Sequence, residues 1–147
     1  FGFRLVHFSV MSNHMHIVVE AENPTAHSRG MQGLLVRIAR ALNSAVIRRG
    51  RVFADRFHSR VLRTTLQVKN ALLYALNNAR KHGIPLTTPL DPYSSAAWFH
   101  GWRFDFEVAR PADEPPVAPA KSWQLTCGFL LHGRLDPFGV PSARRIA

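Results

Sequence analysis

The sequence predicts a fold of the α+β class, and three observations support that prediction. Residues 4–20 show a period of two, apolar residues recur at helical spacing between Met31 and Val46, and a second helical segment follows Thr64. The chain has 147 residues, a length typical of one domain. The predicted order of elements is strand, strand, helix, strand, helix.

Residues 4–20 are expected to form a tight β-hairpin. Large apolar residues occupy every second position from Val6 to Val10, alternation recurs in 14–19, and Ser12-Asn13 supplies the turn. Each predicted strand therefore has two different faces.

The segment after Asn23-Pro24 is expected to be an amphipathic helix that Gly50 terminates, because its apolar residues follow the i, i+3, i+4, i+7 rule from Met31 to Val46. Residues 52–63 return to alternation, with apolar side chains on one side and arginine and histidine on the other. They are therefore predicted to be a strand with one basic, solvated face.

A second helix is predicted to begin at Thr64 or Thr65, either of which can cap it. It is expected to end near His82, because Gly83 and Pro85 form a C-terminal signal directly after that position.

Composition predicts how the chain is divided. Residues 1–108 are expected to form the main domain, 109–120 a stiff proline-rich linker without large apolar residues, and 121–147 a tail with a short helix. The opening residues 1–4 have neither an initiator Met nor the features of a signal peptide, so the chain is expected to begin in mid-domain.

Composition also restricts the compartment and the partners. The only cysteine, Cys127, excludes an internal disulfide and a multi-cysteine zinc site, and no apolar run approaches the ~20 residues that a membrane span needs. A cytoplasmic protein without a membrane partner is expected. The formal net charge is +10, from 19 Lys and Arg against 9 Asp and Glu, and this predicts a polyanionic partner.

The positive charge is concentrated between Arg37 and Lys69, where Asp55 is the only acidic residue. Arginine predominates in this segment, and its guanidinium group can donate two parallel hydrogen bonds to one phosphate. Phosphate binding is the predicted role, and a merely solvated basic face is the alternative.

Two histidines are the first candidates for chemistry. His14 and His16 project from the same face of a strand with Cα atoms ~7 Å apart, so their imidazoles can converge on one divalent ion. A chain with eight histidines also produces such pairs by chance, so the spacing alone leaves a structural role open.

The second helix supplies two further candidates. One of its faces is polar, with Asn70, Tyr74, Asn77, Asn78 and Lys81. A phenol on a polar face is a candidate nucleophile, although packing is the commoner role of tyrosine. Asn78 can supply an amide oxygen as a third ligand. Two imidazoles, one amide oxygen and open positions suit Mg²⁺ or Mn²⁺ held mainly by substrate phosphate.

Four sequence blocks extend these observations: residues 10–19, 28–32, 50–58 and 74–84. In this order they resemble the HUH single-tyrosine transposases, and most closely the REP-associated branch of that family. Residues 91–95, 122–125 and 132–136 resemble less specific C-terminal stretches of the same relatives.

The resemblance implies a ferredoxin-like split β-α-β domain, with an antiparallel sheet and helices on one face. It implies that His14 and His16 bind the metal and that Asn78 completes the site. It also implies that Tyr74 attacks a DNA phosphodiester, giving a 5′-phosphotyrosine link and a free 3′-hydroxyl. The implied substrate is single-stranded DNA folded into imperfect palindromic hairpins. The implied contacts to its backbone are Arg48, Arg49, Arg51, Arg56, Arg60 and Arg63.

Two features depart from the family pattern. The family's first strand and first helix are missing before Phe1, which is expected to expose sheet edges unless another chain fills the gap. Ala79 stands where relatives commonly have Pro. Three functions therefore stay open: a strand transferase, a noncatalytic DNA-binding remnant, and a small metal-dependent hydrolase that forms no tyrosine adduct. The protein is expected to be a monomer or a homodimer.

Overall fold

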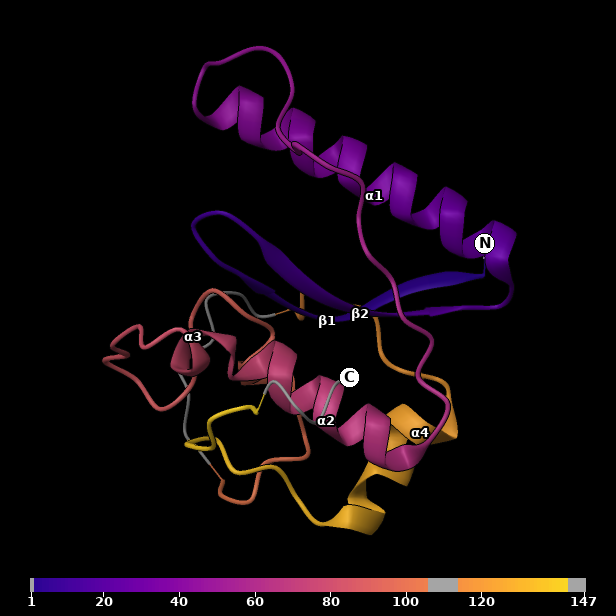
Figure 1. The fold of residues 1–147 in the computed structure, drawn as a ribbon, viewed down its shortest axis with the longest axis vertical. Helices are drawn as coiled ribbons and strands as arrows, with labels where there is room; N and C mark the ends of the chain where they lie inside the picture. The colour runs from indigo at the N-terminus through magenta and orange to yellow at the C-terminus, as the bar shows by residue number, and fades with distance from the viewer. Residues whose placement is uncertain (1, 106–113, 143–147) are drawn as a thin grey trace. The chain divides into compact units, whose positions relative to one another are not determined.

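The computed structural model describes residues 2–105 and 114–142. β1 and β2 form a two-stranded antiparallel sheet (Figure 1). The elements in chain order are β1 (Phe3–Val10), β2 (Met15–Ala21), α1 (Pro24–Ala45), α2 (Thr65–Leu76), α3 (Asn78–Lys81), the 3-10 helix η1 (Ala96–Trp98), α4 (Trp123–Thr126) and the 3-10 helix η2 (Gly128–His132). The α+β class is confirmed, whereas a ferredoxin-like arrangement stays a prediction.

The predicted hairpin is confirmed. Its turn lies at Ser12 and Asn13, and across it the backbone N–H of Met11 donates to the carbonyl of His14 at 2.8 Å. Because the two strands are adjacent in the chain, a turn signal and two alternating segments are enough to specify their pairing.

One face of β2 connects the core to the candidate site. Successive side chains of a strand point to opposite faces, so His16, Val18 and Glu20 lie on the same one. Val18 packs in the hydrophobic core with Leu72 of α2 and Phe129 of η2, and the latter two are fully buried. The core therefore holds the middle of this face, with His16 on one side of Val18 and Glu20 on the other.

The start of α1 agrees with the prediction of a helix after Asn23-Pro24, whereas its end lies before the predicted stop at Gly50. The helix begins directly after Asn23, whose side-chain oxygen accepts a hydrogen bond from the backbone of Ala26 at 2.8 Å. It ends at Ala45, and Ile47 adopts a left-handed φ of 49°. The helix therefore starts before Met31, the first residue of the repeat, and stops before Gly50.

The predicted strand over 52–63 is wrong. These residues lie in neither a strand nor a helix. The side chains of Arg48 and Arg51 donate to the carbonyls of Arg51 and Phe53, at 3.1 and 2.7 Å. Alternation favours a strand only where another strand can pair with it, and the described ranges contain no strand besides β1 and β2. The segment instead connects α1 to α2 as irregular chain.

The N-terminus of α2 lies where the sequence predicts it. The side chain of Thr64 accepts a hydrogen bond from the backbone of Gln67 at 3.2 Å, and the side chain of Gln67 accepts one from the backbone of Thr64. This reciprocal pair is a capping box, and it satisfies two backbone donors that the helix leaves free.

The predicted continuous helix to His82 is interrupted at Asn77. The side-chain amide of Asn77 donates to the carbonyls of Asp136 and Gly139, at 3.0 and 2.8 Å. These carbonyls come from a segment about 60 residues away in the chain, so local sequence could not predict the interruption. α3 resumes at Asn78.

The chain divides into two compact units. In the first unit, Gly30 of α1 lies against the ring of Phe3, where a Cβ atom would come within 2.1 Å of the ring. The second unit contains most of the sheet, α2 and the whole candidate site described below. The first unit comprises residues 1–3 and 21–61, and the second comprises 4–20 and 62–147.

The C-terminal region belongs to the second unit. Residues 109–113 of the predicted linker lie outside the described residues. Further along the linker, the backbone of Ala118 donates to the carbonyl of Leu5 at 2.9 Å. The predicted tail contributes three side chains to the core: Leu125, Phe129 and Leu135.

None of the helices in the described ranges is long and apolar enough to cross a bilayer.

Candidate active site

The hairpin brings the two predicted metal ligands together. The rings of His14 and His16 meet edge to face, with centroids 5.1 Å apart and planes at 83°. Nδ1 of His14 lies 2.7 Å from Oδ1 of Asn13, so with the proton on Nδ1 the other ring nitrogen, Nε2, carries a lone pair. This contact favours the tautomer in which Nε2 is free to bind a metal.

Tyr74 reaches this pair from α2. Its ring lies edge to face against His16, with centroids 4.7 Å apart and planes at 89°. The tyrosine is half-buried, and its ring packs against the histidine ring. The structure therefore places the predicted nucleophile beside a predicted ligand, although the two are 58 positions apart in the chain.

Asn78 supplies the third predicted ligand from α3. Its side chain is fully buried, and its Nδ2 lies 3.4 Å from Nε2 of His14. Its Oδ1 is buried without a hydrogen-bond partner among the described residues. A buried polar atom without a partner is costly, and rotation of the amide by 180° would exchange Oδ1 with Nδ2 beside His14. An ion at this point would satisfy the oxygen.

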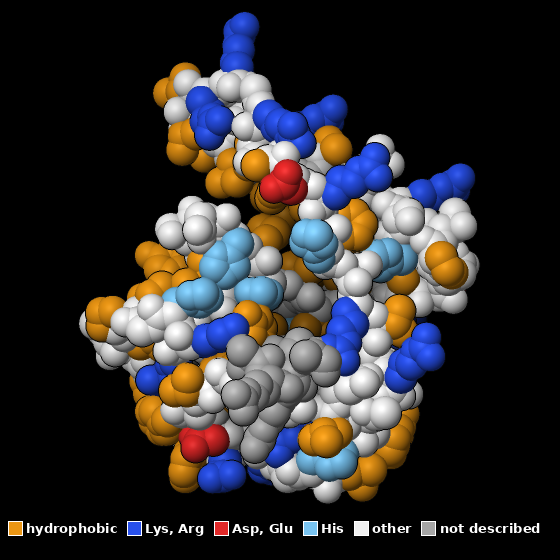
Figure 2. All heavy atoms as spheres, in the orientation of Figure 1, with side chains coloured by type: hydrophobic (Ala, Val, Ile, Leu, Met, Phe, Trp, Pro, Cys, Tyr) orange, Lys and Arg blue, Asp and Glu red, His pale blue; other side chains and the backbone are white. Residues whose placement is uncertain are grey.

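Two neighbours of the site were not predicted to act in it. Nζ of Lys81 donates to the hydroxyl oxygen of Tyr74 at 2.5 Å and lies 4.0 Å from the centroid of its ring. The ring of His82 lies 5.1 Å from that of His14. Tyr74 and Lys81 are seven residues apart on the same predicted polar face, so the sequence could have indicated that Lys81 lies near Tyr74. The position of His82, by contrast, depends on the packing of α3 against the hairpin. Figure 2 shows histidine side chains gathered on one face of the molecule.

The electrostatics of the cluster keep His16 neutral. Burial, followed by the neighbouring charges of His14 and Lys81, lowers the pKa of the His16 imidazole to about 4. At neutral pH this ring is therefore uncharged, which is the form that binds a metal ion.

The donor set fits a divalent ion whose other ligands come from the substrate. The described residues contain no group of three or more His, Cys, Asp or Glu side chains able to hold a metal ion. His14, His16 and Asn78 would instead offer two ring nitrogens and one amide oxygen. Such a set leaves coordination positions open for phosphate oxygens and water, as Mg²⁺ and Mn²⁺ require. A metal at this point would neutralise charge on a phosphate group.

A hollow of about 400 Å³ is lined in part by residues that are close to the site residues in the sequence. Its lining includes Met11, which precedes the histidine turn, and Ala79, which follows Asn78. Asp91 also lines it; burial raises the pKa of this carboxyl group, and its Oδ2 has no partner among the described residues. The hollow therefore combines mainly apolar walls with one buried acceptor.

The predicted DNA contacts are exposed, as a phosphate-binding role requires. Figure 2 shows Lys and Arg side chains spread over α1 and the segment after it. Arg48 and Arg51 also bond to carbonyls of their own segment, which shapes that irregular chain. The first unit carries Arg48, Arg49, Arg51, Arg56 and Arg60, and the second carries Arg63.

Comparison of the chain with protein-family models, with curated proteins and with solved structures gave no match.

Proposed function

We propose that this protein nicks and rejoins single-stranded DNA through a covalent link to Tyr74, as the REP-associated tyrosine transposases that it resembles do. The observation that carries the proposal is the edge-to-face contact between the Tyr74 phenol and the His16 imidazole, whose ring centroids lie 4.7 Å apart. Through His16 the phenol adjoins His14, and His14 lies beside the side-chain amide of Asn78, whose oxygen has no hydrogen-bond partner among the described residues. A nucleophile and a set of metal ligands within one cluster suit attack on a phosphodiester.

The proposed reaction is a transesterification. The hydroxyl oxygen of Tyr74 bonds to phosphorus while the bond from phosphorus to the 3′-oxygen breaks. The phenol proton passes to solvent, and the departing 3′-oxygen takes up a proton. The product is a 5′-phosphotyrosine link with a free 3′-hydroxyl, and attack by a 3′-hydroxyl on that link reverses the step. His14, His16 and Asn78 would hold Mg²⁺ or Mn²⁺, which supplies charge neutralisation at the phosphate.

The proposed substrate is single-stranded DNA that folds into palindromic hairpins. The formal charge of +10 and the exposed arginines after α1 support a polyanionic partner. The half-buried tyrosine also favours a flexible single strand, because a strand that is not stacked in a duplex can bring its phosphate to a partly buried residue.

The experiment is adduct formation with end-labelled hairpin DNA and Mn²⁺, analysed on a denaturing gel. The chain has two tyrosines, so Tyr93→Phe is a matched control for Tyr74→Phe. We expect the wild type and Tyr93→Phe to form a covalent adduct. Tyr74→Phe should bind the hairpin with similar affinity but form none, because it lacks only the nucleophilic oxygen.

The alternative functions give different outcomes. Binding of the hairpin by the wild type without any adduct would replace the proposal with a noncatalytic DNA-binding function. Metal-dependent cleavage by Tyr74→Phe at the wild-type rate would indicate a hydrolase that uses the histidines alone.

A further inference from the structure

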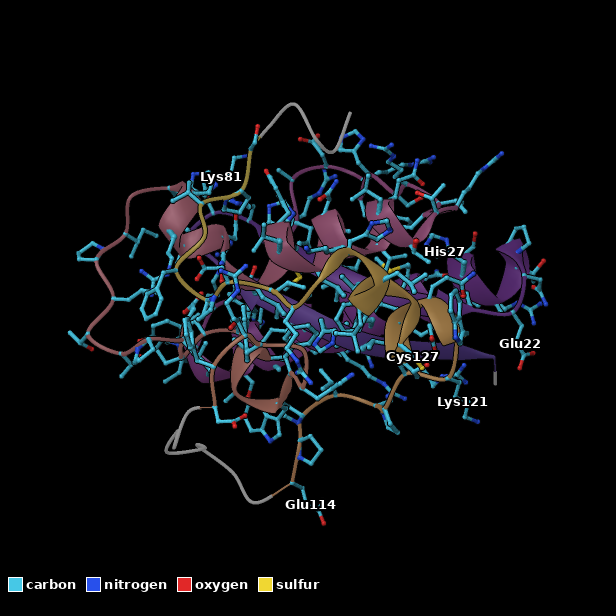
Figure 3. The ribbon with its side chains drawn as sticks, turned by 90° about the horizontal axis from the view of Figure 1, so that it is seen from below. Glu22, His27, Lys81, Glu114, Lys121 and Cys127 are labelled. Atoms are coloured by element: carbon cyan, nitrogen blue, oxygen red, sulfur yellow. The ribbon has the colours of Figure 1, made fainter. Side chains whose placement is uncertain are left out.

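Lys81 holds the oxygen atom that the proposed reaction uses. Its ammonium group donates a hydrogen bond to the Tyr74 hydroxyl oxygen at 2.5 Å and lies 4.0 Å from the ring centroid. The same tyrosine ring packs edge to face against His16. The phenol is therefore held by two contacts, and one of them ends on the nucleophilic atom. Lys81 is the last residue of α3, and Figure 3 labels it there.

The charge of Lys81 has no carboxylate to balance it in the described ranges, where the one ion pair joins Arg4 to Glu20. Its ammonium group is instead directed at a phenol oxygen. Such a placement favours a negative charge at that oxygen and an anionic group beside it.

We infer that Lys81 is a catalytic residue that positions the Tyr74 oxygen for attack and stabilises the negative charge on that oxygen in the transition state. The inference rests on the proposed DNA-joining function and adds a residue to it. During attack, the phenol oxygen gains negative charge as its proton leaves to solvent, and it gives up that charge as its bond to phosphorus forms. During rejoining the same oxygen departs from phosphorus with the bonding electrons. A fixed cation at hydrogen-bond distance assists both directions.

The contact can be tested without any reaction. Labelling with [13Cζ]tyrosine gives one NMR resonance each for Tyr74 and Tyr93, and Tyr93→Phe assigns them. Lys81→Met keeps the length of the side chain and removes its charge, and it should shift the Tyr74 resonance while that of Tyr93 stays in place. Lys121→Met is the control, because Figure 3 shows Lys121 far from Lys81. An unchanged Tyr74 resonance in Lys81→Met would overturn the inference and leave the proposed function standing.

The role in catalysis is tested by single-turnover adduct formation at saturating hairpin DNA. Lys81→Met should slow the step by about 100-fold, the typical effect of removing one transition-state donor, while DNA affinity stays within about threefold. Lys81→Arg should recover most of the rate because it restores a cationic donor, and Lys121→Met should match the wild type.

The remaining outcomes are also decisive. A rate unchanged in Lys81→Met, or a slow rate that Lys81→Arg does not improve, would contradict the inference. If the wild type forms no adduct, the proposed function fails and the catalytic role of Lys81 fails with it, even where the NMR contact is present.

Discussion

The ring of His16 meets the ring of Tyr74 edge to face, with centroids 4.7 Å apart and planes at 89°. His16 comes from β2 and Tyr74 from α2, and the core between these elements, which includes Val18 and Leu72, sets their separation. The geometry of the site is therefore a consequence of core packing.

The first prediction concerns the histidines. His14→Ala and His16→Ala should each reduce metal-dependent DNA cleavage by about 100-fold or more, because each removes one of few ligands. Hairpin binding should stay near that of the wild type. His132→Ala, which alters an exposed histidine outside the cluster, is the control in the same cleavage assay. Full cleavage by either His14→Ala or His16→Ala would refute the ligand assignment.

The second prediction tests the metal site without DNA. Asn78→Asp places a carboxylate at a fully buried position, so it should lower the melting temperature in EDTA, and Mn²⁺ should restore it. Adding His14→Ala to this variant should abolish the restoration, because a second ligand is lost. Differential scanning fluorimetry measures the melting temperatures of the wild type, of Asn78→Asp and of the double variant. An equal Mn²⁺ effect with and without His14 would place the ion elsewhere.

The third prediction concerns the basic segment. If its six arginines each contact a phosphate, the logarithm of hairpin affinity should fall with the logarithm of salt at a slope of about −4. Neutralising Arg48 and Arg49 to Gln should make the slope shallower by about 1.4 and weaken all hairpins alike, because phosphate contacts do not read sequence.

Fluorescence anisotropy at several salt concentrations measures the slope. The control variant carries Arg103→Gln and Lys121→Gln, which remove the same net charge from other exposed positions. If both double variants change the slope equally, the basic segment is only a solvated face.

The fourth prediction is a loss of stability in mild acid. Burial, and then the charge of His100, lowers the pKa of His7 from 6.5 to about 4. Because the folded protein resists protonation of this ring, the unfolded state binds its proton first as the pH falls. The stability contributed by neutral His7 is full above pH 6.5 and is lost as the pH drops toward 4, by about 2 kcal/mol at pH 5.

Urea unfolding of the wild type and His7→Gln at pH 7 and pH 5 checks this expectation. His7→Gln should be less stable at pH 7, where it loses the packing against Phe99 and the hydrogen bond to Ser95. It should also lose less stability than the wild type between the two pH values. Parallel losses in the two proteins would show that His7 does not contribute to the acid sensitivity.

The fifth prediction concerns Glu20, which joins the hairpin to the tail. Its carboxylate accepts hydrogen bonds from the backbones of Lys121 and Ser122 and from the side chain of Arg4, at 2.7 to 3.1 Å. Burial raises the pKa of Glu20, but the hydrogen bonds of Ser122, Lys121 and Arg4 outweigh it, and the pKa is lowered. Glu20→Gln should reduce the free energy of unfolding by about 1–3 kcal/mol.

Urea unfolding measures the effect, and Glu22→Gln is the control at an exposed position (Figure 3). Equal stability of the two variants would mean that the carboxylate of Glu20 does not hold the tail.

The sequence by itself determined the features that rest on neighbouring residues. The hairpin needed only two alternating segments around Ser12 and Asn13, and the start of α2 needed only Thr64 and Gln67. The two histidines on one strand face were predictable for the same reason, because the period of a strand is a local property.

Only the tertiary structure decided the features that depend on distant partners. Residues 52–63 alternate like a strand, yet neither β1 nor β2 pairs with them. Asn77 interrupts the second helix because the tail presents carbonyl groups to its side chain. Lys81 and His82 join the site because α3 packs beside the hairpin turn. Alternation, capping and spacing act within a few residues, whereas pairing and packing depend on segments that approach one another only when the chain folds.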